Sequence, residues 1–458
     1  MALPPGPPLP ASLQTLLYAA RPVEFLEGCH RRYGDAFSIH TLMFGREACF
    51  CHPDVVKEVF TADADTLRAG EANAPLGPLV GPKSVLLLDG PEHLRQRRLL
   101  MPPLHGDRMT AYGRTMVEVT ERVVDAWPTG RPIRAHPSMQ RITLDVILRT
   151  VFGVEEGAAM AELGAALAKV LDRQGTPMGA LAMVPQLQHE LGGLTPYGRF
   201  RRDVARADAL ILEQIAARRV KRDDGRSRDD ILSMLVDARD ETGAPMTDAE
   251  LRDELVTLLV AGHETTATAL CWSLDAIAHA PRVQERLHDE IDRAPDGWAR
   301  APYLDATVRE VLRLFPVVPA VGRRLSRDAR VGGFDLPAGT LVVPAVYFAN
   351  RHPSAYDDPE TFMPERFLDK KPDPYAWIPF GGGVRRCLGM AFALYEMKAV
   401  LATALARFDV VPVRPEPART TLRAFTHVPE RGAEVIVVRR ARPRVAPAAP
   451  PPAATASL

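Results

Sequence analysis

The sequence predicts a mostly α-helical fold with a small β region. Apolar residues recur at helical spacing through most of the chain between residues 13 and 440. Only three short segments alternate like strands, and they lie at residues 36–40, 48–52 and 340–344. No linker rich in Ser and Gly divides the 458 residues into parts of different composition. We therefore expect a single domain that spans residues 13–440.

Both ends of the chain are rich in Pro and Ala. Residues 1–12 and 441–458 contain too little apolar surface to order themselves, so we expect them to be extended or disordered. The first residues lack the basic and apolar regions of a signal peptide, and no run of about 18 apolar residues is present to span a membrane. We expect a soluble, cytoplasmic, monomeric protein without a membrane anchor.

Charge and cysteine content narrow the function classes. The chain carries 57 basic and 57 acidic residues, so nothing global points to nucleic acid as a partner. Its five cysteines form no CxxC pair and no regular framework, which is typical of a protein from a reducing compartment. This pattern leaves room for one thiolate that is reserved for chemistry.

The longest expected helix begins at Thr247, which forms a capping box with Glu250 and opens a long periodic stretch. It can continue to Pro281, a length of about 50 Å at 1.5 Å per residue, which is enough to cross the whole domain. Two shorter helices are expected at about 282–293 and 302–315, the second ended by the proline that follows it.

A polar patch interrupts the middle of this helix, where the apolar run Leu255–Val260 gives way to Ala261–Thr266. Gly262 weakens the helix by about 1 kcal/mol relative to alanine, and threonine hydroxyls compete for backbone carbonyls. We expect the hydrogen-bond ladder to open here and to admit oxygen or water. A zinc-protease motif is excluded, because Ala267 stands where the second histidine of His-Glu-x-x-His is required.

The segment Phe380–Gly389 presents Cys387 from a glycine-rich turn with a cation, Arg385, two positions earlier. The stretch that follows has helical spacing, so the cysteine lies at or near a helix N-terminus, where the dipole favours a thiolate. Such a thiolate is a suitable axial ligand for iron. The dinucleotide fingerprint does not fit, because its third glycine would fall on Arg386. From these residues alone, a buried structural cysteine remains the alternative.

This segment resembles the haem-binding loop of the cytochrome P-450 superfamily, Phe-x-x-Gly-x-Arg-x-Cys-x-Gly. The five fixed positions all match, at Phe380, Gly383, Arg385, Cys387 and Gly389. The resemblance implies that Cys387 ligates the iron of haem b and that the neighbouring loop residues contact the haem, namely Phe380, Gly381, Arg385 and Gly389. In this family the cysteine thiolate favours cleavage of the O–O bond.

The polar patch Ala261–Thr266 resembles the oxygen-activating signature A/G-G-x-D/E-T-T/S of the same superfamily. The resemblance implies that Glu264 and Thr265 are a catalytic acid–alcohol pair. Thr265 would hydrogen-bond the iron-bound oxygen, Glu264 would relay protons to it, and Ala261 would contact the haem. A polar contact satisfied inside the core is the alternative for these residues.

Two further elements resemble the superfamily's E-x-x-R and P-E-R-F motifs. Glu310 and Arg313 lie three residues apart, and Arg366 follows in Pro-Glu-Arg-Phe. The resemblance implies that the three form a buried charge network, which supports the cysteine loop and takes no part in catalysis. The alternative is an ordinary solvated pair worth a few tenths of a kcal/mol.

Haem carries two propionates, and four residues match the places where the superfamily supplies donors to them: His93, Arg97, Arg323 and Arg385. Arginine suits this task because its planar fork bonds a carboxylate in a bidentate manner. His93 stands where tryptophan is commoner in the superfamily. The alternative for each is a solvated surface charge.

The resemblance implies that the haem lies between a long distal helix and a proximal loop and helix that bear the cysteine. It implies a monooxygenase that inserts one atom of O2 into a hydrophobic small molecule. A haem-thiolate peroxygenase or isomerase is the alternative, followed by a non-enzymatic haem or gas-binding protein.

By position in the superfamily, small aliphatic residues line the substrate pocket at Val260, Val317, Val318 and Val321. They favour a fatty acid, terpene, steroid or polyketide. The chain shows no reductase or flavin segment, so electrons should come ultimately from NAD(P)H through a ferredoxin or flavodoxin with its reductase. A basic patch for that partner is expected at Arg95, Arg98 and Arg386, with a plain solvated face as the alternative.

Overall fold

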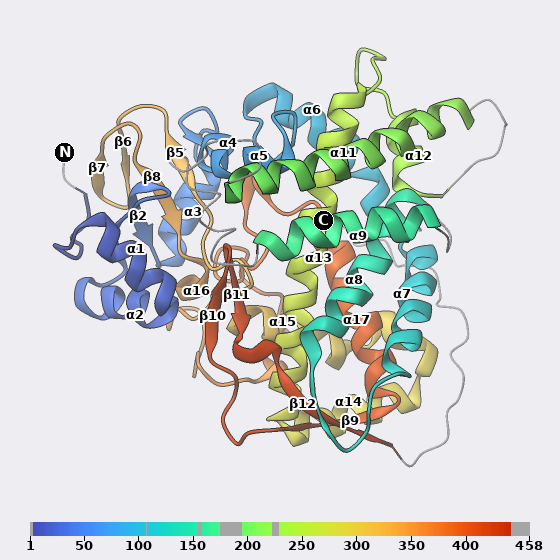
Figure 1. Cartoon of the computed structure of the whole chain (residues 1–458). Helices are drawn as coiled ribbons and strands as arrows, with labels where there is room; N and C mark the ends of the chain where they lie inside the picture. Colours follow the sequence, from blue (N-terminus) through green and yellow to red (C-terminus); the bar gives the residue numbers. More distant parts are fainter. Residues whose placement is uncertain (1–2, 107, 154–157, 175–194, 222–228, 441–458) are drawn as a thin grey trace.

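The computed structural model describes residues 3–106, 108–153, 158–174, 195–221 and 229–440 (Figure 1). The expected C-terminal tail, residues 441–458, lies outside the described residues, as do the first two residues of the proline-rich segment. The described chain is mostly helical and carries small sheets, which confirms the predicted fold class. In Figure 1 the strands formed by the N-terminal part gather on one side, and most of the helices lie on the other.

The helices differ widely in length. The long ones are α1 (Ala11–Ala20), α2 (Pro22–Tyr33), α3 (Pro53–Thr61), α6 (Gly90–Leu100), α7 (Arg108–Val124), α8 (Ala135–Phe152), α9 (Ala158–Gln174), α11 (Pro196–Lys221), α13 (Asp248–Ala278), α14 (Pro281–Arg293), α15 (Pro302–Leu314) and α17 (Met390–Leu405). The short ones are α4 (Ala69–Ala72), α5 (Gly77–Val80), α12 (Ile231–Asp237) and α16 (Val346–Ala349).

The strands are all short. They are β1 (Ala36–Thr41), β2 (Gly45–Phe50), β3 (Leu67–Arg68), β4 (Pro132–Arg134), β5 (Arg323–Leu325), β6 (Ala329–Val331), β7 (Phe334–Leu336), β8 (Leu341–Pro344), β9 (Phe408–Pro412), β10 (Thr420–Arg423), β11 (Thr426–Pro429) and β12 (Glu434–Arg439). The three segments that the sequence predicts as strands become β1, β2 and β8.

These three strands are neighbours in a five-stranded sheet of order β1-β2-β8-β5-β3. β1 and β2 are antiparallel, whereas β2 and β8 are parallel, with Glu47 opposite Leu341. Because side chains alternate along a strand, β2 sends Phe50 into one small core and Cys49 into another. The other sheets are β4-β12-β9 and the hairpins β6-β7 and β10-β11.

The proline-rich segment, residues 3–10, contains no helix or strand and lies against β1. The backbone N–H of Ser38 donates to the carbonyl of Pro5 at 2.9 Å. The side-chain amide of Gln14, on α1, donates to the carbonyl of Leu9 at 2.8 Å. The segment is therefore bonded to the sheet edge through its backbone.

The long expected helix is α13, and its capping box forms as predicted. The Glu250 N–H donates to the Thr247 hydroxyl at 3.2 Å, and the Glu250 carboxylate accepts the Thr247 N–H at 2.8 Å. The helix ends at Ala278, and Pro281 then opens α14 as its first residue. Most residues of α13 are buried, because helices surround it on several sides.

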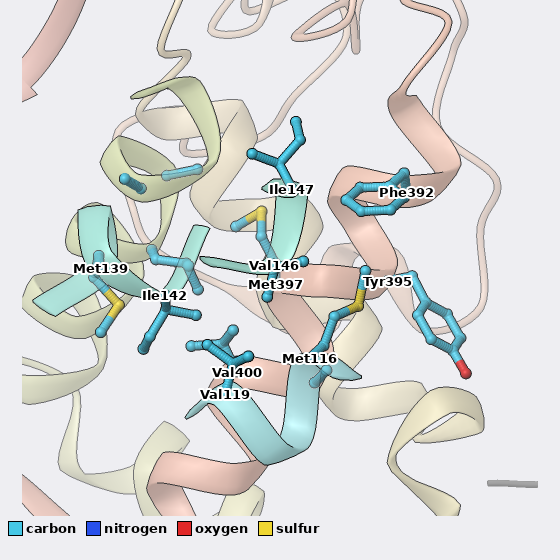
Figure 2. Packing of buried hydrophobic residues seen from close by; sticks show 14 of the residues in the cluster. Met116, Val119, Met139, Ile142, Val146, Ile147, Phe392, Tyr395, Met397 and Val400 are labelled. Atoms are coloured by element: carbon cyan, nitrogen blue, oxygen red, sulfur yellow. The ribbon is translucent and has the colours of Figure 1, made fainter. Parts of the chain in front are cut away.

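The largest hydrophobic core lies around α13, which contacts α8, α11, α15 and α17. Helices far apart in the sequence meet in it, as Figure 2 shows for side chains of α7, α8 and α17. The labelled residues are Met116, Val119, Met139, Ile142, Val146, Ile147, Phe392, Tyr395, Met397 and Val400. This packing fixes α17, which follows the cysteine loop, against the central helix. Among the described helices, none has the length and apolarity needed to cross a membrane.

We predict that Thr247→Ala lowers the free energy of unfolding by about 1 kcal/mol, because α13 loses its capping hydroxyl. Thr247→Ser keeps the hydroxyl and should stay within about 0.5 kcal/mol of the wild type. Urea unfolding followed by circular dichroism measures both. Equal losses in the two variants would contradict the capping role.

Candidate functional site

Close packing against α3 shapes the loop that carries Cys387. Gly383 has a φ of 63°, and a Cβ at this position would lie 2.3 Å from the carbonyl oxygen of Phe60. Glycine is therefore required both by the backbone conformation and by the close approach. The Cys387 N–H donates to the carbonyl of Phe380 at 2.9 Å, which closes the loop. α17 begins shortly after, at Met390, so Cys387 lies just before a helix N-terminus as the sequence predicts.

The Cys387 side chain is exposed, whereas the other four cysteines are buried. Desolvation nevertheless raises the pKa of its thiol, against the opposing effects of the Gly389 N–H and the guanidinium of Arg97. Protein atoms therefore surround the sulfur, yet it borders a space that solvent can reach. Ala261 has a similar position, because it is exposed while Leu259 and His263 beside it on α13 are buried.

Four cationic or ionisable side chains lie close together near Cys387. Desolvation and the guanidinium groups of Arg385 and Arg97 lower the pKa of His93 to about 4. Desolvation and Arg385 likewise lower the pKa of Arg323 to about 10. These residues come from α6, β5 and the cysteine loop, and their mutual repulsion shows an excess of positive charge. The carboxylate that moderates it is Asp89.

Asp89 was not identified from the sequence. Its carboxylate forms an ion pair with Arg385, which also donates to the carbonyl of Val85 at 3.0 Å. The same carboxylate accepts the N–H groups of Gly70 at 2.9 Å and Glu71 at 3.2 Å, so it caps α4. Asp89 directly precedes α6, but its side chain makes no capping bond to that helix. Its carboxylate bonds α4 and Arg385, which are distant in the sequence, so the residues next to Asp89 could not predict these contacts.

Glu310, Arg313 and Arg366 lie together in the core. Arg313 donates to both oxygens of Glu310, at 2.7 and 2.9 Å, and both side chains are fully buried. Arg366 donates to the same carboxylate at 3.1 Å. The remaining donors of Arg313 bond backbone carbonyls, including that of Asn350 at 3.1 Å. Burial and complete hydrogen bonding distinguish this arrangement from a solvated pair.

Asn350 connects this network to the segment before Cys387. Its side-chain amide bonds the carbonyl of Arg313 at 3.3 Å, and its side-chain oxygen accepts the N–H of Ile378 at 2.9 Å. The indole of Trp377 donates to the carbonyl of Arg309 on α15 at 3.1 Å. The chain that enters the cysteine loop is thus attached to α15 at two adjacent residues.

Glu264 lies on α13 with its carboxylate directed toward α8 and the β10-β11 hairpin. One oxygen contacts Nε2 of His136 at 3.1 Å, and the other accepts the amide of Gln140 at 2.9 Å. Arg423 lies 3.5 Å away. Desolvation raises the pKa of Glu264, but His136 and Arg423 oppose it and leave that pKa below its usual value. None of these three partners was identified from the sequence.

Thr265, the next residue, donates its hydroxyl to the carbonyl of Ala261 at 2.5 Å. This is the competition for backbone carbonyls that the sequence predicts, but α13 is continuous across residues 261–266. The expected opening is therefore not seen as a break in the helix. Gly262 has a packing role instead, because a Cβ there would lie 2.6 Å from Cδ1 of Ile147 on α8.

Val260 lines a hollow between α9, α11 and α13. The other lining residues are Leu79, Leu167, Val170, Val204, Ala207, Asp208, Val256 and Leu259. The other three valines expected at the pocket lie on the segment between α15 and β5 and do not line this hollow. Val317 is buried and its carbonyl accepts the N–H of His427 at 2.8 Å, whereas Val318 and Val321 are half-buried.

Comparison with known proteins decides the family. A family model described as Cytochrome P450 matches residues 3–435. The chain belongs to the cytochrome P450 family. It is 40% identical over 438 residues to cytochrome P450 135B1 of Mycobacterium tuberculosis, which covers 95% of this chain and 92% of that protein. It is 38% identical over 442 residues to cytochrome P450 135A1 of the same organism, with 96% of each chain covered.

Solved structures agree with the sequence comparison. This P450 superposes on the retinoic acid-bound cyanobacterial CYP120A1 with a TM-score of 0.83 and 26% identity, over 96% of this chain and 99% of that one. It superposes on the haem domain of cytochrome P450DA with a TM-score of 0.82 and 25% identity, over 96% and 98% of the two chains. The protein is thus a monooxygenase of the haem-thiolate type, a family that uses O2 and redox partners.

The residues gathered in this P450 fit a haem. Cys387 is exposed, and its thiolate would bind the haem iron. The cluster around His93 and Arg323 has an excess of positive charge, which the two negative propionates of a haem would offset. Ala261 is exposed on α13, although most of that helix is buried, and its small side chain leaves room for the flat haem beside the helix.

The expected basic patch of this P450 is largely neutralised. Arg95 pairs with Asp240 and Glu250, each at 2.6 Å, and Arg98 pairs with Glu241. These acidic residues lie in the turn before α13 and in the first turn of that helix. The sequence around the arginines gives no sign of these pairings. Two of the three arginines expected to form a basic patch for a redox partner are therefore already paired with carboxylates, and the patch stays a prediction.

We predict that Glu310→Ala lowers the free energy of unfolding by about 3–5 kcal/mol, because it leaves the buried Arg313 guanidinium without its carboxylate. Asp289→Ala, which removes an exposed ion pair with Arg293, should change it by less than about 0.5 kcal/mol. Urea unfolding of both variants checks this. A small loss for Glu310→Ala would show that the network contributes no more than a surface pair.

Proposed function

We propose that this P450 inserts one atom of O2 into a hydrophobic small molecule, with haem b as its cofactor. We assign the activity to one domain, residues 13–440, and propose that it acts as a monomer. The observation that carries the proposal is the exposed Cys387 beside a cluster of arginines whose charge Asp89 offsets only in part. When bound, haem supplies the reduction of O2 and the transfer of an oxygen atom.

Cys387 would hold the haem iron through its thiolate. The propionates would be held by His93, Arg97, Arg323 and Arg385, and further contacts would come from Ala261, Phe380, Gly381 and Gly389. The mutual repulsion of the cations supports this role, because binding two carboxylates relieves it. Glu310, Arg313 and Arg366 would support the loop from behind, through the bonds that Asn350 makes to both sides.

Glu264 and Thr265 would handle protons at the distal side. Thr265 lies one turn after the exposed Ala261 and already bonds its carbonyl, so its hydroxyl is on the exposed side of α13. Glu264 faces another side of α13, toward His136 on α8. The two adjacent residues therefore face two surroundings, the exposed side of α13 and the polar groups of α8.

The substrate would be an apolar molecule of the fatty acid, terpene, steroid or polyketide type. The residues packed around Val260 support this class through their character, because they are aliphatic apart from Asp208, and that carboxylate bonds Arg252. We propose further pocket contacts from Val317, Val318 and Val321. Electrons would come from NAD(P)H through a ferredoxin or flavodoxin with its reductase.

We expect the reduced carbon monoxide complex of the purified protein to absorb at the thiolate-specific position of the Soret region. Cys387→Ser should lose this band, because a serine oxygen replaces the thiolate. Cys29→Ser, at a buried cysteine, should retain it. A wild-type protein that binds no haem would overturn the proposed function.

Val260→Phe should weaken the binding of apolar ligands by about tenfold, because the larger ring fills the hollow that the valine lines. The low-to-high-spin shift during titration with lipophilic compounds measures this affinity. Val220→Phe places the same change on an exposed part of α11 and should leave the affinity unaltered. Equal affinities in the two variants would exclude this hollow as part of the substrate site.

A further inference from the structure

His136 joins Glu264 to the surface through a defined chain of hydrogen bonds. It is the second residue of α8, and its Nε2 lies 3.1 Å from Oε1 of Glu264. Nη1 of Arg423, on the β10-β11 hairpin, lies 3.3 Å from Nδ1 of the same ring, and Nε of Arg423 lies 3.5 Å from Oε1 of Glu264. The imidazole, the carboxylate and the guanidinium therefore form one cluster in which each group contacts the other two.

These contacts determine where the ring carries its proton. A guanidinium has donors and no acceptor, so Nδ1 of His136 must accept from Arg423. Nε2 then carries the hydrogen and donates it to the Glu264 carboxylate. His136 is thus held in the Nε2–H tautomer, with a transferable hydrogen directed at Glu264.

Gly432 keeps the ring in this place. A Cβ at Gly432 would lie 2.9 Å from Cβ of His136, and its φ of 73° also favours glycine. The turn Glu430–Gly432 therefore packs directly against the base of the side chain. This close approach limits the positions that the imidazole can take.

Arg423 is the most exposed of the three charged or ionisable groups. The exposed fraction of the side chain is 18% for Glu264, 10% for His136 and 25% for Arg423. Gln140 bonds the other oxygen of Glu264, but its amide has no ionisable proton to deliver. His263 is bonded to the Thr143 hydroxyl of α8 at 2.8 Å and makes no hydrogen bond to the Glu264 carboxylate among the bonds of the described residues.

We propose that His136 resupplies Glu264 with protons and that Arg423 gates this supply. The inference rests on the proposed function, in which Glu264 is the acid that gives protons up. When Arg423 moves away, Nδ1 takes a proton from water, and the ring becomes an imidazolium. Nε2 then releases its proton to Oε1 of Glu264. The ring returns to its starting tautomer by losing the Nδ1 proton to water and regaining one at Nε2, so one proton in total passes from water to Glu264.

The tautomer can be measured without turnover. In ¹⁵N-labelled wild-type holoprotein, kept diamagnetic as the reduced carbon monoxide complex, His136 should show a protonated Nε2 and an unprotonated Nδ1. Arg423→Ala removes the donor to Nδ1 and should shift that resonance. A hydrogen on Nδ1 with none on Nε2 in the wild type would overturn the proposal, because Glu264 would then receive no donation from the ring. The wild-type measurement requires no variant to fold.

Turnover rates distinguish a role of His136 in proton supply from a role in holding the Glu264 carboxylate in place. His136→Gln keeps an amide donor but has no ionisable proton, and should lower the turnover rate by about 100-fold while leaving substrate affinity unchanged. Gln140→Ala removes one hydrogen bond to the same carboxylate and measures the structural part of the effect. His136→Ala should be partly rescued by added imidazole. Equal rates for the first two variants, without rescue of the third, would overturn the role of His136.

The carbon monoxide spectrum keeps this result distinct from a failure of the proposed function. If every variant retains the thiolate band and His136→Gln turns over normally, the proton route is wrong and the monooxygenase stands. If the wild type lacks the band, the proposed function itself fails.

Discussion

The fully buried ion pair between Glu310 and Arg313 is the constraint on which the position of the cysteine loop depends. A buried charge costs several kcal/mol unless its partner and hydrogen bonds are complete, so the pair permits little variation in its surroundings. Arg313 satisfies its remaining donors with carbonyls of the segment that precedes the loop, such as Pro359 at 2.7 Å. Asn350 extends the same bonding to Ile378. Electrostatics in the core thus fixes a backbone segment that has no regular structure of its own.

Close packing fixes the other end of this loop. Gly383 lies against the backbone of Phe60, and α17 packs into the core between α7 and α13. Between these two anchors, Cys387 remains exposed in surroundings that desolvate it. The same region collects the guanidinium groups of Arg323 and Arg385, which repel each other. The positive charge in this region therefore exceeds the negative charge, and a group with two negative charges can offset the excess. The packing of the rest of the fold holds these cations in place.

The sequence predicted the parts of this structure that depend on local order. The capping box at Thr247, the proline that separates α13 from α14, and the strands β1, β2 and β8 follow from spacing within a few residues. The partners of these elements could not be predicted in the same way. Asp89 meets Arg385 across almost 300 positions, and Glu250 neutralises Arg95 across 155. Such pairs are set by tertiary packing, which leaves no periodic signal in one sequence.

The polar patch on α13 shows how one helical stretch can serve two surroundings. Consecutive residues on a helix point about 100° apart, so Thr265 and Glu264 cannot face the same space. Thr265 bonds back to Ala261 on the exposed side, while Glu264 bonds residues of α8 and the β10-β11 hairpin. Gly262 allows this, because the missing side chain brings α8 close enough for His136 and Gln140 to reach the carboxylate. The glycine that the sequence marked as a weak point of the helix thus acts through packing, and it places an ionisable chain behind the site.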